Sequence, residues 1–135
     1  MISYVCIGVD DMAAAERFYT AFLPELGYQL SYYHGDLSFD PPERDHPGPS
    51  FYVKRPFDGA PARSGNGNMV AFEAPNQAEV RRLHARALEA GGTDEGAPGF
   101  RADYDADFFV SYLRDPQGNK IALYSVNPAD PARDS

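Results

Sequence analysis

Few side chains in this sequence are suited to covalent or acid–base chemistry. Cys6 is the single cysteine, and a thiol becomes a good nucleophile only beside a base or a positive charge. No histidine is placed to assist it, so we expect Cys6 to be a small buried residue. Glu73 ends a predicted strand and can act as a general base if it is partly buried. Its place at a strand end favours exposure to water instead.

Metal ligands and positive charges are equally scattered. The three histidines, His34, His46 and His84, fall at an early strand end, in a proline-rich loop and on a helix, so no convergence is indicated. One cysteine can form neither an internal disulfide nor a thiolate metal cluster. Lys54 and Lys120 at strand ends can meet an anionic substrate, although lysines at sheet edges are more often simply solvated.

Length and composition predict one compact domain. The chain has 135 residues, of which 43% are hydrophobic and 13% aromatic, enough for a proper core. Its 12 basic and 20 acidic residues give a formal charge of -8, which disfavours nucleic acid and anionic membranes as partners. No apolar run approaches the roughly 20 residues that span a bilayer, and no secretory signal pattern is present. We expect a cytoplasmic protein that binds neither nucleic acid nor membrane.

One pattern occurs twice along the chain. Each copy reads as an alternating strand, a polar helix start, an amphipathic helix and a closing glycine. The corresponding pairs are Val5 and Val70, Ile7 and Phe72, Asp11 and Asn76, Phe18 and Leu83, Leu23 and Leu88, and Gly27 and Gly92. A duplication of this kind predicts two half-folds with a shared cleft as the natural functional site.

The first copy begins with a strand over residues 2–9, where apolar side chains alternate with others. Asp10 or Asp11 can cap the helix that follows, and Gly27 ends it. The apolar stripe of this helix is Ala15, Phe18, Tyr19, Phe22 and Leu26. Further strands are predicted at residues 28–33, 36–39 and 50–54, with a polar loop at residues 41–49.

Dense Pro and Gly residues mark a linker before the second copy. There, Asn76 and Glu79 resemble a capping box, and Gly92 ends the helix. A loop rich in Gly, Asp and Pro precedes two strands joined by a hairpin turn that begins at Asp115. The expected strands cover residues 68–73, 107–114 and 119–126. The domain spans residues 1–126 (first module 1–56, linker 57–66, second module 67–126), and residues 127–135 form a polar, frayed tail.

Three segments carry a resemblance to a known family. They are YVCIGVDD at residues 4–11, AFEAP at residues 71–75 and RDPQGNKI at residues 114–121. In this order and spacing, over roughly residues 1–126, the chain resembles the glyoxalase, bleomycin-resistance and extradiol dioxygenase superfamily, also called vicinal oxygen chelate proteins. The resemblance implies an α+β fold in which two βαβββ modules form a half-open barrel, with the helices outside and the ligand inside.

The resemblance also implies a divalent metal site. Metal enzymes of this family hold the ion through the first and last strands of each module, usually by two His and two Glu, leaving positions open for substrate oxygens. The matching positions here are Tyr4, Tyr52, Met69 and Ala122. Because none offers the usual donor, we expect no metal of this type and no cofactor. A metal held by other residues stays an open alternative.

Strand alternation indicates which side chains would line the cleft. Val5, Phe51, Val70 and Ile121 are suited to packing against the helices, which sends their neighbours to the concave face. The expected ligand-binding residues are Tyr4, Cys6, Tyr52, Met69, Ala71, Phe108, Tyr112, Ala122 and Tyr124. This lining suits a small hydrophobic or aromatic molecule held by stacking and a few hydrogen bonds. Alternatively, the aromatic rings fill the barrel themselves.

Three functions are compatible with this sequence. We favour a glyoxalase or bleomycin-resistance-like protein that binds a small molecule without the metal. An alternative is an enzyme, either a glyoxalase-like lyase or isomerase or a dioxygenase-type enzyme. Such an enzyme would work without a metal, through Glu73 or a tyrosine hydroxyl, or would hold its metal through displaced ligands. The second alternative is a non-catalytic interaction or assembly subunit. A homodimer is compatible with all three, since isologous dimers are the commonest soluble assemblies.

Overall fold

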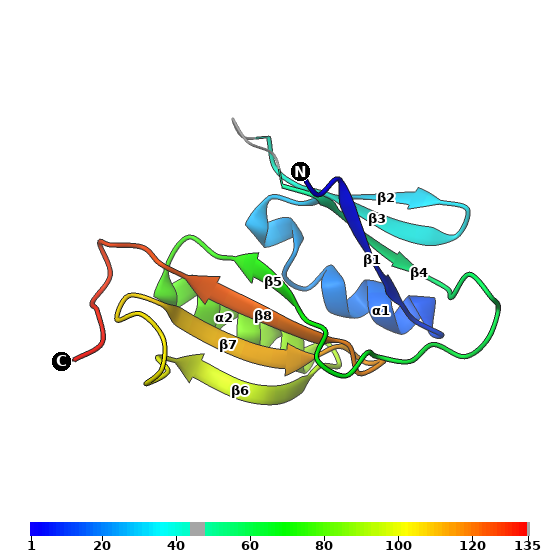
Figure 1. Cartoon of the computed structure of the whole chain (residues 1–135). Helices are drawn as coiled ribbons and strands as arrows, with labels where there is room; N and C mark the ends of the chain where they lie inside the picture. The colour runs from blue at the N-terminus through cyan, green and yellow to red at the C-terminus, as the bar shows by residue number, and fades with distance from the viewer. Residues whose placement is uncertain (44–47, 135) are drawn as a thin grey trace.

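Each half of the protein contains one four-stranded sheet and one α-helix, as Figure 1 shows. The computed structural model describes residues 1–43 and 48–134, so His46 lies outside the described residues. The first module comprises β1 (Tyr4–Gly8), α1 (Met12–Tyr19), the 3-10 helix η1 (Pro24–Leu26), β2 (Gln29–Tyr33), β3 (Asp36–Asp40) and β4 (Ser50–Lys54). The second comprises β5 (Val70–Glu73), α2 (Gln77–Glu89), β6 (Thr93–Gly99), β7 (Phe109–Arg114) and β8 (Lys120–Ser125).

The two sheets have the same topology and the same register. Their strand orders are β1-β4-β3-β2 and β5-β8-β7-β6, with the first strand of each module parallel to its last. Val5 lies opposite Phe51 in the first sheet, as Val70 lies opposite Ile121 in the second. This confirms the predicted α+β fold of two βαβββ modules, and the sheets do not close into a barrel.

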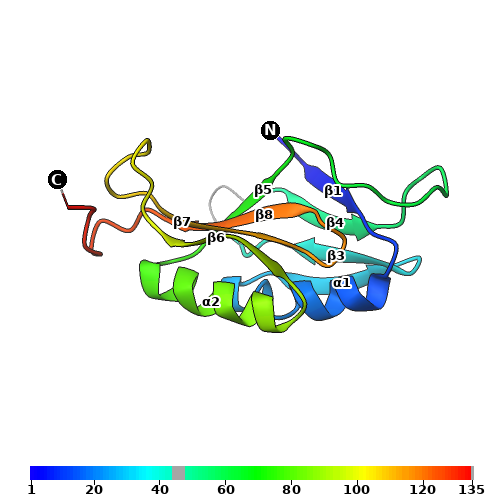
Figure 2. The ribbon, with the colours of Figure 1, turned by 90° about the horizontal axis from the view of Figure 1, so that it is seen from below.

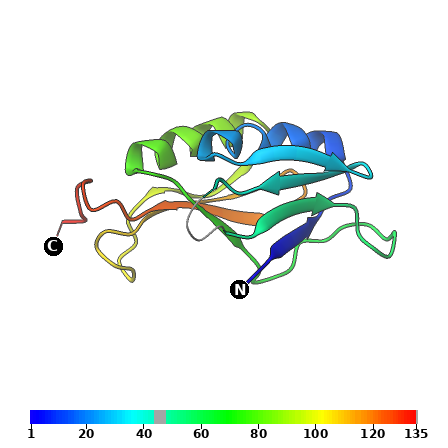
Figure 3. The same ribbon diagram turned by 90° about the horizontal axis from the view of Figure 1, so that it is seen from above.

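Both helices cover the same side of the two sheets, as the two rotated views show (Figures 2 and 3). We call the opposite side of the sheets the open face. Among the described residues, no helix combines the length and apolar character needed to cross a membrane.

The predicted helix caps are present. The Asp11 carboxylate accepts a hydrogen bond from the amide of Ala14 at 3.0 Å, and the Asn76 side chain accepts one from the amide of Glu79 at 2.8 Å. The first helix is shorter than expected, because α1 ends at Tyr19 and a separate 3-10 turn runs from Pro24 to Leu26. Proline has no N–H for an α-helical hydrogen bond, which accounts for the break.

The two modules share one hydrophobic core. The ring of Phe72 on β5 packs edge-on against Phe51 of the first module, with centroids 5.2 Å apart, and against Phe22 at 6.0 Å. Tyr28 approaches the same ring at 5.7 Å. Neither module therefore completes its core alone.

The turn between β7 and β8 ties the modules together. Asp115 is 2% exposed, and its Oδ1 accepts hydrogen bonds from the backbone amides of residues 117–119, which confirms its predicted role as a turn former. Its Oδ2 accepts the hydroxyl hydrogen of Tyr19 in the first module, at 2.7 Å. The Asn119 side chain donates to the carbonyl of Gly8 at 3.0 Å. The turn thus joins β1 and α1 to the second sheet.

The expectation of a loop before β7 was wrong in part, because Thr93–Gly99 forms the edge strand β6. Its pairing with β7 is irregular, with register shifts on both sides of Gly96. A Cβ atom at Gly96 would lie 2.9 Å from the Tyr112 ring, so close packing of this strand requires glycine there. The same glycine content made the segment resemble a loop in the sequence.

The tail was predicted to be frayed, and this too was wrong for the described residues. The Asp130 carboxylate accepts a hydrogen bond from the amide of Gln77 at the start of α2, at 2.8 Å. The Arg133 guanidinium donates to the carbonyls of Arg101 at 2.7 Å and Tyr104 at 2.9 Å. The tail is therefore held against α2 and the loop between β6 and β7.

Candidate functional site

The open face carries the side chains that alternation assigned to it. Cys6 and Tyr4 are exposed, whereas the neighbouring Phe51 and Val53 of β4 are buried toward the helices. The nine predicted site residues lie on β1 (Tyr4 and Cys6), β4 (Tyr52), β5 (Ala71), β7 (Tyr112) and β8 (Ala122 and Tyr124), with Met69 and Phe108 directly before β5 and β7. The prediction that Cys6 is a buried filler was wrong, because the thiol is exposed.

In the first module, two tyrosines form the aromatic part of the open face. The rings of Tyr4 and Tyr52 lie 5.1 Å apart at an angle of 34°. Tyr4 remains 57% exposed, and Cys6 lies opposite Tyr52 in the parallel pairing of β1 and β4. This pair offers a solvent-facing ring surface rather than an enclosed pocket.

The second module has a denser set of rings. Phe108 stacks on Tyr124 at 5.3 Å and meets Tyr104 edge-on at 5.6 Å. The Lys120 ammonium lies 5.0 Å from the centroid of the Tyr112 ring, in cation–π geometry. Ala122 is only 1% exposed, so its methyl group lies in the floor of this surface.

The nine residues do not share one cavity in the described part of the chain. The aromatic cavity, of about 380 Å³, is lined by Met69, Asp103, Tyr104, Asp105, Phe108 and Tyr112. The linker cavity, of about 440 Å³, lies between β1, β5 and the linker and includes Cys6, Arg63, Met69 and Lys120. A third cavity, of about 360 Å³, includes Tyr52 and Lys54. Met69 belongs to the first two.

A divalent metal of the expected kind does not fit the four corresponding positions. Tyr4, Tyr52, Met69 and Ala122 provide two neutral phenols, a thioether and a methyl group, which are poor partners for a catalytic divalent ion. Within residues 1–43 and 48–134, no group of three or more His, Cys, Asp or Glu side chains has metal-binding geometry. We therefore derive no chemistry through a metal.

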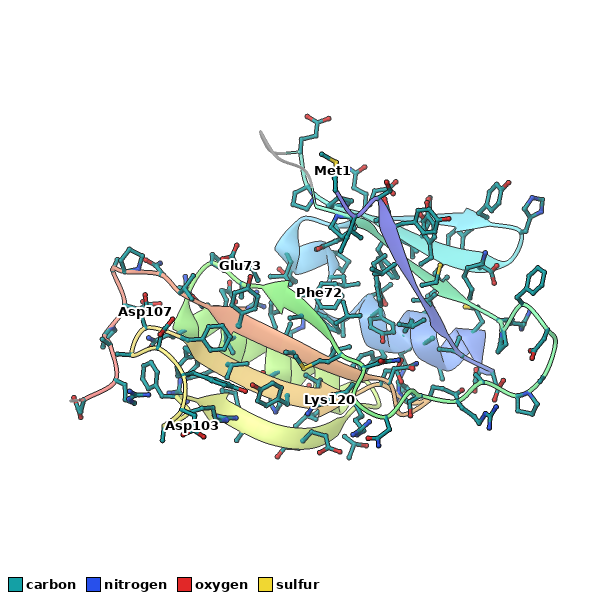
Figure 4. All side chains as sticks on the ribbon, in the orientation of Figure 1. Met1, Phe72, Glu73, Asp103, Asp107 and Lys120 are labelled. Atoms are coloured by element: carbon teal, nitrogen blue, oxygen red, sulfur yellow. The ribbon has the colours of Figure 1, made fainter. Side chains whose placement is uncertain are left out.

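The candidate acid–base groups lie far from one another in the fold. Glu73 is exposed at the far end of β5, where it lines a cavity with Glu25, whereas Lys120 lies near the centre of the molecule (Figure 4). His34 is exposed in the turn between β2 and β3. His84 is buried on α2, with Nε2 3.3 Å from the Asp94 carboxylate, and burial lowers its pKa against the opposing effect of Asp94.

Tyr112 is poorly suited to act as a base. Burial, followed by a hydrogen bond to Tyr104, raises the pKa of its hydroxyl, and the positive charge of Arg101 opposes this only in part. The hydroxyl therefore stays protonated near neutral pH. It can donate a hydrogen bond, and its ring can stack.

Several residues of these cavities were missed in the sequence. Arg63 and Ser64 line the linker cavity, but they lie in a segment whose Pro and Gly content indicated only a connection, and Asn68 was predicted only as the start of a strand. Tyr104 lies in a loop that has no periodicity. Its only signal was an aromatic residue among the acidic Asp103 and Asp105, and that signal is weak.

Two βαβββ modules with matched registers and a common open face define the two-module glyoxalase fold. The family model of the Glyoxalase/Bleomycin resistance protein/Dioxygenase superfamily matches residues 1–123. The chain belongs to this superfamily.

Solved structures agree with this assignment. A glyoxalase/bleomycin resistance protein from Albidiferax ferrireducens T118 is 34% identical, with 93% of this chain and 98% of that chain covered and a TM-score of 0.79. A glyoxalase-related enzyme from Fulvimarina pelagi is 18% identical (97% and 91% covered, TM-score 0.73). The fosfomycin resistance protein FosX from Mesorhizobium loti is 16% identical (93% and 91% covered, TM-score 0.63). These last two likenesses concern the fold alone. Comparison with curated proteins gave no match.

Proposed function

We propose that this protein binds a small aromatic or apolar molecule on its open face, without the divalent metal of its metalloenzyme relatives. The aromatic cavity is the observation that carries this proposal. Its volume of about 380 Å³ lies within the range of small-molecule sites, and its walls combine Met69 with the rings of Tyr104, Phe108 and Tyr112. Rings and a thioether favour stacking with a planar ligand.

The distribution of reactive groups supports binding over catalysis. Cys6, Glu73 and His84 belong to the linker cavity, the far end of β5 and the helix layer, respectively. General acid–base catalysis needs such groups within hydrogen-bond reach of one reacting atom. Stacking needs only the rings that are already gathered in the aromatic cavity.

The proposal is tested with 1-naphthol as the probe and the full chain as purified. The sequence contains no Trp, so naphthol fluorescence can be followed without a strong protein background. We expect naphthol to bind and to raise the melting temperature, because a ligand bound only to the native state stabilises it by mass action. Elemental analysis of the same preparation should give far less than one divalent ion per chain.

Two matched variants locate the site. Phe108→Ala removes a ring that stacks on Tyr124, and we expect roughly fivefold weaker naphthol binding, since one aromatic contact is worth about 1 kcal/mol beyond its area. Phe57→Ala removes an exposed ring that lines none of the cavities described above, and binding should be unchanged. Stoichiometric zinc, iron, nickel or manganese in the purified protein, or no binding of naphthol at millimolar concentration, would overturn the proposal.

A further inference from the structure

The linker cavity differs in charge from the aromatic cavity and from the cavities that contain Glu25 and Asp36. The chain has 20 acidic residues, and carboxylates line the cavities around Glu25, Asp36 and Asp103. Among the described residues that line the linker cavity, none is acidic, and two, Arg63 and Lys120, are basic. An adjoining cavity of about 530 Å³, which shares Lys120, is also free of carboxylates in its described lining.

Four polar side chains of the linker cavity are unused donors, whereas the Asn119 side chain already donates to the Gly8 carbonyl and the Asp115 carboxylate. Arg63, Ser64, Asn68 and Lys120 form no side-chain hydrogen bond or ion pair with any residue in 1–43 or 48–134. The neighbouring Arg114, by contrast, pairs with Glu95 at 2.5 Å. The Lys120 ammonium only contacts the ring face of Tyr112. Two positive charges, a hydroxyl and an amide thus remain available to an oxyanion.

The linker cavity adjoins the aromatic cavity. Met69 lines both, and Tyr112, which Lys120 contacts, lines the aromatic cavity. Figure 4 places Lys120 near the centre of the molecule, and Asp103 and Asp107 in the loop between β6 and β7. Asp103 and Asp105 line the aromatic cavity, so an anionic substituent is favoured on the side of Lys120, which a ring lying on Met69 and Tyr112 can reach.

We propose that the ligand of the open face is an aromatic anion, whose carboxylate or phosphate-type group is bound by Lys120 and Arg63 in the linker cavity. This inference rests on the proposed function and adds the chemical class of the ligand. The overall negative charge of the protein repels anions, so binding depends on this local pair of cations.

Cys6 provides a specific reporter for the test. It is the only cysteine, it is exposed, and it lines the linker cavity. Its alkylation by uncharged iodoacetamide should slow when the cavity is occupied. The probes are 1-naphthyl phosphate, 1-naphthol and inorganic phosphate, which separate the anionic group from the ring.

We expect naphthyl phosphate to bind at least tenfold more tightly than naphthol or inorganic phosphate and to protect Cys6. Lys120→Met keeps the apolar stem on Tyr112 and removes the charge, and it should weaken naphthyl phosphate binding about tenfold, as expected for one charge-assisted hydrogen bond at a partly exposed site. Arg63→Met should act in the same direction. Lys54→Met is the matched control, because Lys54 shares its cavity with Asp36 and Asp40, and it should change nothing.

The outcomes separate the two proposals. Equal binding of naphthol and naphthyl phosphate, unaffected by Lys120→Met, would overturn the anionic ligand and leave the proposed function in place. Equal binding of inorganic phosphate and naphthyl phosphate, with no binding of naphthol, would support the cation pair and overturn the aromatic ligand. No binding of any probe would overturn both. Variants are compared only if their melting temperatures without ligand match that of the unaltered protein.

Discussion

The buried contact between Tyr19 and Asp115 gives the sharpest stability prediction. The Tyr19 hydroxyl donates to the Asp115 carboxylate at 2.7 Å, and both residues are almost fully buried. A hydrogen bond to a charged group contributes about 1.5 to 3 kcal/mol. Asp115 keeps four other hydrogen bonds, from three backbone amides and the Asn119 side chain, so Tyr19→Phe should cost about 2 kcal/mol, toward the lower end of that range.

This cost converts to a measurable change in melting temperature. A chain of 135 residues has an unfolding entropy of roughly 0.28 kcal/mol per kelvin, so the expected decrease is about 7 °C. Urea unfolding followed by circular dichroism should give a lower midpoint with an unchanged slope. Tyr33→Phe is the control, because the Tyr33 ring is exposed and touches only His34 among its aromatic neighbours in the described chain.

The same contact has a signature at alkaline pH. Burial, and then the negative charge of Asp115 and the hydrogen bond to it, raise the pKa of Tyr19 well above 10. The folded state therefore keeps a proton that the unfolded chain loses above about pH 10, and stability falls as pH rises beyond that value. Tyr19→Phe should flatten this fall. A Tyr19→Phe variant that is no less stable than Tyr33→Phe, with an unchanged alkaline profile, would refute the reasoning.

Three further variants probe other parts of the fold. Burial lowers the pKa of His84, so the neutral imidazole should contribute its full stabilisation above about pH 6.5, and this stabilisation should decrease as pH falls toward the lowered pKa. The melting temperature should therefore fall between pH 7.5 and pH 5. His84→Gln should remove this fall, and the control His34→Gln should keep it. Gly118 has φ +104°, so Gly118→Ala should destabilise by about 1 to 2 kcal/mol in urea, whereas Gly48→Ala, whose new methyl group meets open space, should cost much less. Arg133→Ala removes the donor to the carbonyls of Arg101 and Tyr104, and hydrogen exchange should accelerate in the loop between β6 and β7; unchanged exchange there would show that the tail does not hold this loop.

The repeat and the strand alternation were sufficient to predict the architecture. The strand at Ser50–Lys54 was predicted to the residue, because Phe51 and Val53 alternate with polar neighbours on a half-buried sheet. Strand β6 was missed because Gly96, Pro98 and Gly99 have low β-propensity, and only its packing against β7 makes it a strand. Tertiary contacts also explain why the tail is ordered through Asp130 and Arg133.

The candidate site was less accessible to sequence reasoning. Alternation identified the open face, and the resemblance directed attention to Tyr4, Tyr52, Met69 and Ala122. Neither signal could indicate that the linker folds back so that Arg63 lines the same cavity as Lys120, because this arrangement depends on the path of an irregular segment. The pairing of Tyr19 with Asp115 was missed for the same reason, since neither residue type identifies a partner so distant in sequence.

The hydrogen bonds that join the first strand to the last hairpin also affect how the chain folds during synthesis. Gly8 and Tyr19 leave the ribosome early, yet their partners Asn119 and Asp115 follow about a hundred residues later. At translation speeds of about 5 to 20 residues per second, the apolar side chains that the first module contributes to the shared core stay exposed for several seconds before the last hairpin is synthesised. We therefore expect nascent chains to recruit chaperones, and fragments that stop before the last hairpin to aggregate.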